Sequence, residues 1–165
     1  MVEEEIANSF TNFLSLISIL ERWREAREQV MRLLGYTVKV GVPIKASFRY
    51  EKTLGELPPG KEALLRVLRE YSYAPYEPGM KVLFGVNDYR VYIAREGEGD
   101  VIGSGFLGGG YAGEVSMEFF LKLALYFDEK DWEEMRRIAA ERLRETAELV
   151  EKLKAAAAAM ELLLK

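Results

Sequence analysis

The sequence predicts an α+β fold in which long N- and C-terminal helices pack together, with an inserted antiparallel sheet of about four strands and a short helix. The prediction depends on where the hydrophobic period changes. Apolar residues recur every three or four positions up to Leu34, every second position from Val38, and mostly at helical spacing again from Val115.

The chain has the length of one ordinary domain. Its 165 residues are 49% apolar, which is enough to bury a hydrophobic core. We therefore expect residues 1–165 to form a single domain. Residues 1–36 and 114–165 would make its helical part, and residues 37–113 would be a β-rich insertion.

The N-terminal helix is predicted to end at Leu34. Gly35 follows the last apolar position, where a left-handed residue commonly stops a helix. Glutamates at positions 3–5 suit the positive end of the helix dipole. The apolar face of this helix carries Ile6, Phe10, Phe13, Ile17 and Leu20.

The β-rich insertion begins with the clearest strand pattern in the chain. Apolar or aromatic residues occupy every even position from 38 to 50. Pro43 has no N–H to donate, so we expect an edge strand or a bend there. A short helix over 61–71 should follow, and then strands over 80–86, 89–95 and 100–106.

The C-terminal third is predicted to be helical. Residues 115–127 are apolar nearly all round, as in a buried helix. Asp128 is expected to be the N-cap of the next helix, with Phe127 and Trp132 at the two positions of a hydrophobic staple. No Gly or Pro interrupts the chain from there to Lys165, which would give a helix of roughly 55 Å.

Composition argues against most enzyme classes. The chain has neither histidine nor cysteine, so it lacks the commonest general base, the commonest transition-metal ligand and the thiolate nucleophile. We therefore expect no catalytic residue, no metal site and no cofactor. The scarce Asn and Gln, with charge carried mainly by Glu, Arg and Lys, are typical of proteins from thermophiles.

The first twenty residues contain three glutamates and no Lys or Arg, unlike a secretory signal. No stretch approaches the roughly 18 apolar residues that a membrane-spanning helix needs. We therefore expect a cytoplasmic protein without membrane association.

A basic strand face is one candidate site. Residues 37–52 hold four basic residues and one acidic residue, a local charge of +3 in a chain of net charge −4. Such a face could bind the phosphates of a nucleic acid in a nucleoprotein complex. The alternative is a solvated edge protected by lysines, and the aromatic Phe48 and Tyr50 point to the opposite face. The basic residues are Lys39, Lys45, Arg49 and Lys52.

A glycine-rich segment is a second candidate. Gly103, Gly105 and Gly108 match the spacing G-x-G-x-x-G, which in a nucleotide-binding enzyme lets backbone N–H groups approach a phosphate. No helix opens at the third glycine, and no Gly-Lys-Ser/Thr follows within the 103–110 segment. The alternative is a glycine-rich strand end that leads into the buried helix.

The leading hypothesis is a non-catalytic structural protein that self-assembles, or docks on a protein partner, through its terminal helices. The C-terminal helix is longer than the diameter of about 30 Å expected for a compact domain of this size. Part of its coiled-coil-like apolar stripe should therefore be covered by another helix, in a homo-oligomer or a partner complex. The expected interface residues are Val150, Leu153, Ala157, Met160 and Leu164.

Overall fold

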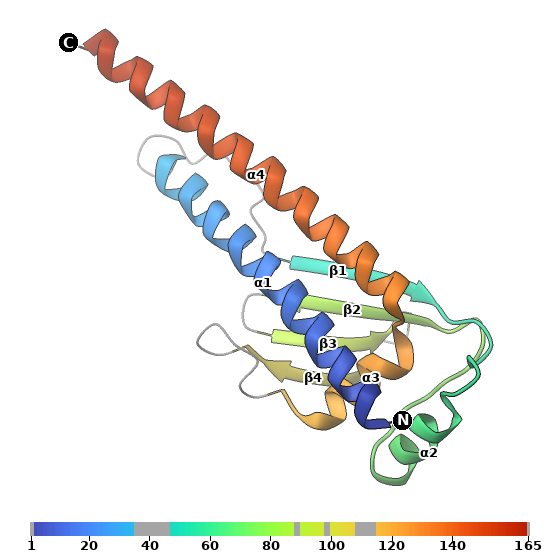
Figure 1. Ribbon diagram of the computed structural model, residues 1–165. Coiled ribbons are helices and arrows are strands. Elements are labelled where there is room, and N and C mark those ends of the chain that lie inside the picture. The colour runs from blue at the N-terminus through green and yellow to red at the C-terminus, as the bar shows by residue number, and fades with distance from the viewer. Residues whose placement is uncertain (1, 35–46, 88–89, 98–99, 108–114, 165) are drawn as a thin grey trace.

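The computed structural model describes residues 2–34, 47–87, 90–97, 100–107 and 115–164, and it confirms the α+β class. In chain order, the described residues form α1 (Val2–Leu34), β1 (Ser47–Thr53), α2 (Glu62–Tyr71), β2 (Lys81–Asn87), β3 (Arg90–Arg95), β4 (Val101–Phe106), α3 (Met117–Tyr126) and α4 (Glu129–Leu164) (Figure 1).

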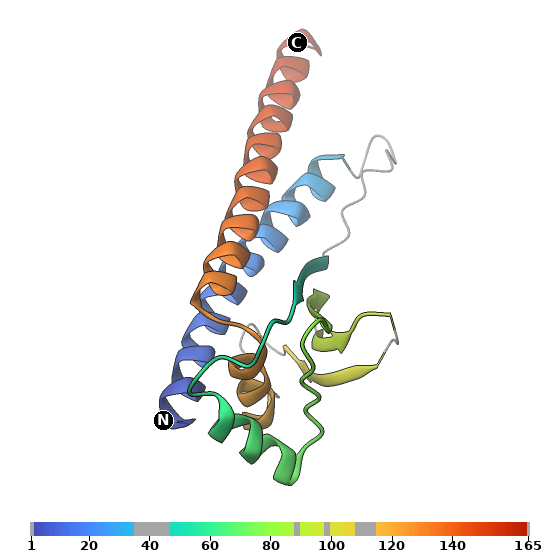
Figure 2. The same ribbon diagram turned by 90° about the vertical axis from the view of Figure 1, so that its right-hand side faces the viewer.

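The terminal helices pack side by side and run in the same direction (Figures 1 and 2). Near the start of the pair, the Asn12 side chain donates to Glu129 Oε1 at 2.7 Å and accepts from Arg136 at 2.6 Å. Further along, Trp23 Nε1 donates to Thr146 Oγ1 at 3.1 Å. The predicted packing of the two helices is therefore confirmed.

The four strands form one antiparallel sheet in the order β1-β2-β3-β4. The expected edge position of the first strand is confirmed, since β1 lies at one side of this order. The described part of that strand starts at Ser47 and runs on to Thr53, beyond the predicted end at residue 50. Positions 38–46, including Pro43, lie outside the described residues.

Helices α1, α3 and α4 lie on one side of the sheet (Figure 2). The core is built largely from aromatic rings between these layers. Phe84 of β2 meets Phe13 of α1 at a centroid distance of 6.5 Å and Trp132 of α4 at 5.9 Å, both edge to face. The prediction that α3 is buried nearly all round is confirmed, because every residue from 119 to 126 is buried.

A reciprocal cap begins α4. Asp128 Oδ1 accepts from the backbone N–H of Asp131 at 3.0 Å, and Asp131 Oδ2 accepts from the N–H of Asp128 at 2.8 Å. The rings of Phe127 and Trp132 lie 6.1 Å apart, as in a hydrophobic staple. Both predictions for this helix start are confirmed.

The Asp131 carboxylate also joins β1 to α4. It is buried, and it accepts from the Tyr50 hydroxyl at 2.8 Å and from Lys52 Nζ at 2.6 Å. Burial of the Tyr50 phenol, reinforced by its hydrogen bond to Asp131, raises the pKa of that phenol. The edge strand is thereby attached to the first turn of the long helix.

We predict that Asp131→Asn lowers the free energy of unfolding by about 2–3 kcal/mol, because one carboxylate oxygen is replaced by an NH₂ that faces donors. Urea denaturation measures this loss. Glu134→Gln is the matched control: it removes the exposed pair between Glu134 and Arg137 and should leave the free energy of unfolding nearly unchanged, because water screens that pair. Equal losses in the two variants would contradict a special role for Asp131.

A second prediction concerns acid. Burial acts to raise the pKa of the Asp128 carboxyl, but the Asp131 N–H and the Lys52 charge outweigh it, so the pKa is lowered. The stabilisation is present above the ordinary pKa of an aspartate and is lost as the pH falls through the folded-state value. Asp128→Asn keeps a good N-cap without the charge. Its melting temperature should therefore fall less than that of wild type between pH 7 and pH 3.

Candidate functional site

The predicted interface stripe on α4 divides into a covered part and an uncovered part. Val150 is buried at 3% exposure, and Leu153 is half-buried. Ala157, Met160 and Leu164 are exposed. The stripe is thus a core contact of the chain at its start and an uncovered surface at its end.

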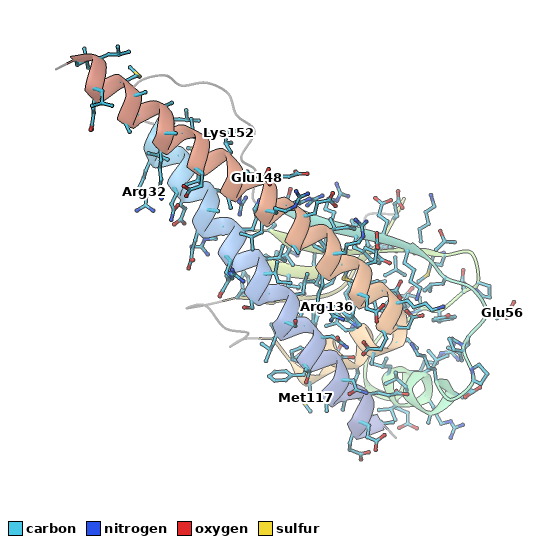
Figure 3. The ribbon with its side chains drawn as sticks, turned by 45° about the horizontal axis from the view of Figure 1, so that its top comes forward. Arg32, Glu56, Met117, Arg136, Glu148 and Lys152 are labelled. Atoms are coloured by element: carbon cyan, nitrogen blue, oxygen red, sulfur yellow. The ribbon has the colours of Figure 1, made fainter. Side chains whose placement is uncertain are left out.

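The uncovered part is the projecting end of α4, residues 154–164, all of which are exposed. Figure 3 shows Arg32, in the last turn of α1, beside the part of α4 that bears Glu148 and Lys152, and α4 continues past this point. Large apolar side chains at this end of α4 are exposed to solvent: 60% at Met160, 75% at Leu162 and 85% at both Leu163 and Leu164.

The basic strand face is only partly described. Lys39 and Lys45 lie outside the described residues. Arg49 is exposed on the side of β1 away from the helices, since its neighbour Phe48 is buried in the core. Lys52 points to the helix side instead, where its amine is 2.6 Å from Asp131 and 3.9 Å from Asp128. The structure therefore separates Lys52 from Arg49.

Two of the motif glycines lie inside β4, in register with Ile93 and Val91 of β3. Gly103 faces α3, and Gly105 faces Val115, which precedes α3. A Cβ at Gly103 would lie 3.3 Å from Lys122 Cδ, and a Cβ at Gly105 would lie 3.1 Å from Val115 Cγ2. Gly108 lies outside the described residues. The geometry of Gly103 and Gly105 is that of close strand–helix packing, without a phosphate loop at these two residues.

Lys122 explains why residue 103 is small. Its side chain is buried, and Nζ donates to the Ile102 carbonyl at 2.6 Å and to Glu118 at 2.8 Å. The Ile102 carbonyl lies at the β-bulge between β3 and β4 and so has no regular ladder partner. The hydrogen bond from Lys122, followed by the one from Ser72, lowers the pKa of Glu118. A lysine in an apolar helix was the only sequence signal of this contact.

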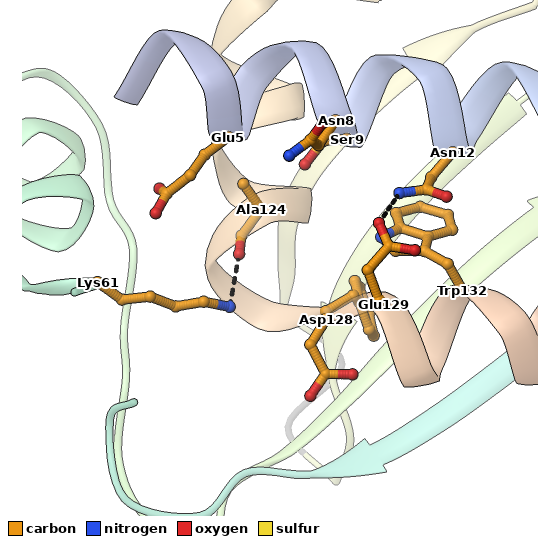
Figure 4. Close-up of a pocket in the computed structure, with 10 residues that line it drawn as sticks. Glu5, Asn8, Ser9, Asn12, Lys61, Ala124, Asp128, Glu129 and Trp132 are labelled. Carbon is orange, nitrogen blue, oxygen red and sulfur yellow. Dashed lines mark hydrogen bonds between the residues drawn. The ribbon is translucent and has the colours of Figure 1, made fainter. Parts of the chain in front are cut away.

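A cavity of about 150 Å³ lies where α1, α3 and the start of α4 meet the residue before α2 (Figure 4). Lys61 reaches into it and donates to the carbonyls of Ala124 at 2.8 Å and Leu125 at 3.3 Å. Burial, with the nearby Lys52 charge, lowers the pKa of Lys61. Because its donors engage the C-terminal carbonyls of α3, this lysine caps that helix.

The acidic residues around this cavity do not form a metal site. Glu5, Asp128 and Glu129 line it. However, no group of three or more acidic side chains within the described ranges converges as metal ligands would. The described helices also include none with a stretch long and apolar enough to cross a membrane.

No protein-family model, curated protein or solved structure matches the chain. A function for the chain is therefore argued from the geometry of its described residues.

Proposed function

We propose that this chain is a non-catalytic assembly protein whose copies associate through the projecting end of α4. The observation that carries the proposal is the exposure of Met160 at 60%, and of Leu163 and Leu164 at 85% each, on neighbouring faces of one helix. Contiguous exposed apolar surface of this kind is typical of interaction sites, because removing it from water is favourable.

The helix end is complementary to a second copy of itself in the antiparallel direction. The stripe Leu153, Ala157, Met160 and Leu164 follows a heptad pattern, so antiparallel pairing would place Leu153 opposite Leu164 of the other copy and Ala157 opposite Met160. In the same arrangement Lys154 lies near Glu161 of the other copy, which makes two opposite-charge pairs.

The run of alanines supports close packing of the two helices. Residues 155–159 are all alanine and all exposed. Interaxial distance depends on the side chains at the contact, and alanine allows the closest approach short of glycine. Met160 could then fill the space that the small side chains of the other copy leave.

The contact would be modest in size. Residues 153–164 span about 17 Å of helix at 1.5 Å per residue. A pair of such segments buries less than the roughly 1,200–2,000 Å² of a standard stable interface. Association should therefore be reversible and dependent on concentration.

We predict that the wild-type chain changes from monomer to dimer as its concentration rises from micromolar to millimolar, measured by sedimentation velocity and light scattering. Met160→Lys/Leu164→Lys should remain a monomer, because two charges enter the apolar seam. Ala158→Lys/Leu162→Lys is the matched control. It adds the same charge to the other side of the same helix and should still dimerise.

A charge exchange tests the orientation of the pair. Lys154→Glu should weaken the dimer, and Lys154→Glu/Glu161→Lys should restore it, because the opposite-charge pairs are then re-formed with reversed signs. A wild-type monomer at every concentration would contradict the proposal. If Met160→Lys/Leu164→Lys still forms dimers, the contact lies elsewhere on the chain. If the end of α4 binds a helix of another protein but not a second copy of itself, docking replaces self-assembly.

A further inference from the structure

We propose that the sheet face opposite the helices binds single-stranded nucleic acid. In this site Tyr92 and Phe106 would stack on bases, and Arg49 and Arg90 would bind phosphates. The proposal is independent of the projecting end of α4, because none of these residues belongs to that helix.

The strand register brings the four residues onto one face. In β3, Val91 and Ile93 are buried in the core, so Tyr92 between them points to the opposite face. Gly85 of β2 pairs with Arg49 on one side and with Tyr92 on the other. Arg90 pairs with Phe106 of β4.

The Tyr92 ring packs against Gly85, which has no side chain. A Cβ on Gly85 would collide with the phenol end of Tyr92, so the ring occupies the space above the glycine. The ring is half-buried, and the guanidinium carbon of Arg90 lies 5.9 Å from its centroid. An aromatic ring held in this way beside a cation is preorganised for stacking on a base.

Phe106 and Val101 extend this aromatic surface along β4. Phe106 is 59% exposed and Val101 is 50% exposed, although both are paired with residues of β3. Ser104, in register with Tyr92, is also exposed and adds a hydroxyl between them. The face therefore presents apolar and aromatic area to solvent with a polar group inside it.

The charge on this face suits a polyanion. Its described cations are Arg49, Lys81 and Arg90, all exposed, and its described carboxylate within the strands is Glu51. The whole chain, by contrast, has a net charge of −4. The cations would attract phosphates while the exposed rings select unpaired bases, whose faces a duplex conceals.

The basic strand face of the sequence analysis lacked aromatic partners, because Phe48 and Tyr50 of the same strand point into the core. The register supplies such partners from β3 and β4. Single-stranded nucleic acid is favoured over a protein partner because aromatic rings next to arginines serve both chemical parts of a nucleotide.

The test is fluorescence anisotropy of the full chain with labelled single-stranded oligo-dT and oligo-rU, with a duplex of equal length alongside. Either single strand should bind more tightly than the duplex. Phe106→Ala should weaken binding about tenfold, as expected for loss of one base–aromatic stack. With two phosphates contacted, by Arg49 and Arg90, log K should fall with log salt at a slope of about −1.4.

Matched variants keep the result specific. Arg49→Ala/Arg90→Ala should weaken binding and flatten the salt slope, whereas Arg66→Ala/Arg69→Ala, an equal charge loss on exposed positions of α2, should leave both unchanged. The proposal is overturned if neither single strand binds at low salt, or if the two arginine pairs weaken binding equally. It is also overturned if Phe106→Ala alters only the oligomeric state, which would make the face a protein contact.

Discussion

The buried carboxylate of Asp131 connects the start of α4 to strand β1. It closes the first turn of α4 with Asp128, and it accepts from Tyr50 and Lys52 of β1. The direction of α4, and hence of its projecting end, depends on this first turn. The edge strand that presents Arg49 depends on the same group, so both proposed surfaces share one point of attachment.

Much of the fold could be predicted from the sequence, because helices and strands reveal themselves by period. The stripe that ends at Leu34 and the apolar stretch of 115–127 predicted α1 and α3, and both were confirmed. The extension of β1 to Thr53 was missed. Lys52 is charged yet occupies a position that faces the helices, and only the distant Asp131 makes that position acceptable.

The candidate surfaces were predictable to different degrees. The spacing of apolar residues predicted the stripe on α4. Spacing does not show where α1 stops covering that stripe, so Val150 and Leu164 were both predicted as interface residues, although Val150 is buried within the chain and Leu164 is exposed. The exposed aromatic residues of the sheet face opposite the helices could not be predicted from the sequence. The bulge at Ile93/Ala94 changes the alternation of β4, and it places Val101 and Phe106 on the same face despite their odd and even numbers.

The parallel direction of α1 and α4 has a consequence for how the chain folds. The hydrogen bonds that join the two helices link residues 117–124 positions apart, so this contact of a mostly helical layer is strongly non-local. Rates of folding fall as contacts become less local, because a long loop must close first. During synthesis at about 5–20 residues per second, the apolar stripe of α1 would wait roughly 6–25 s for α4. The chain thus has an early period of exposure in which other proteins could shield its N-terminal helix.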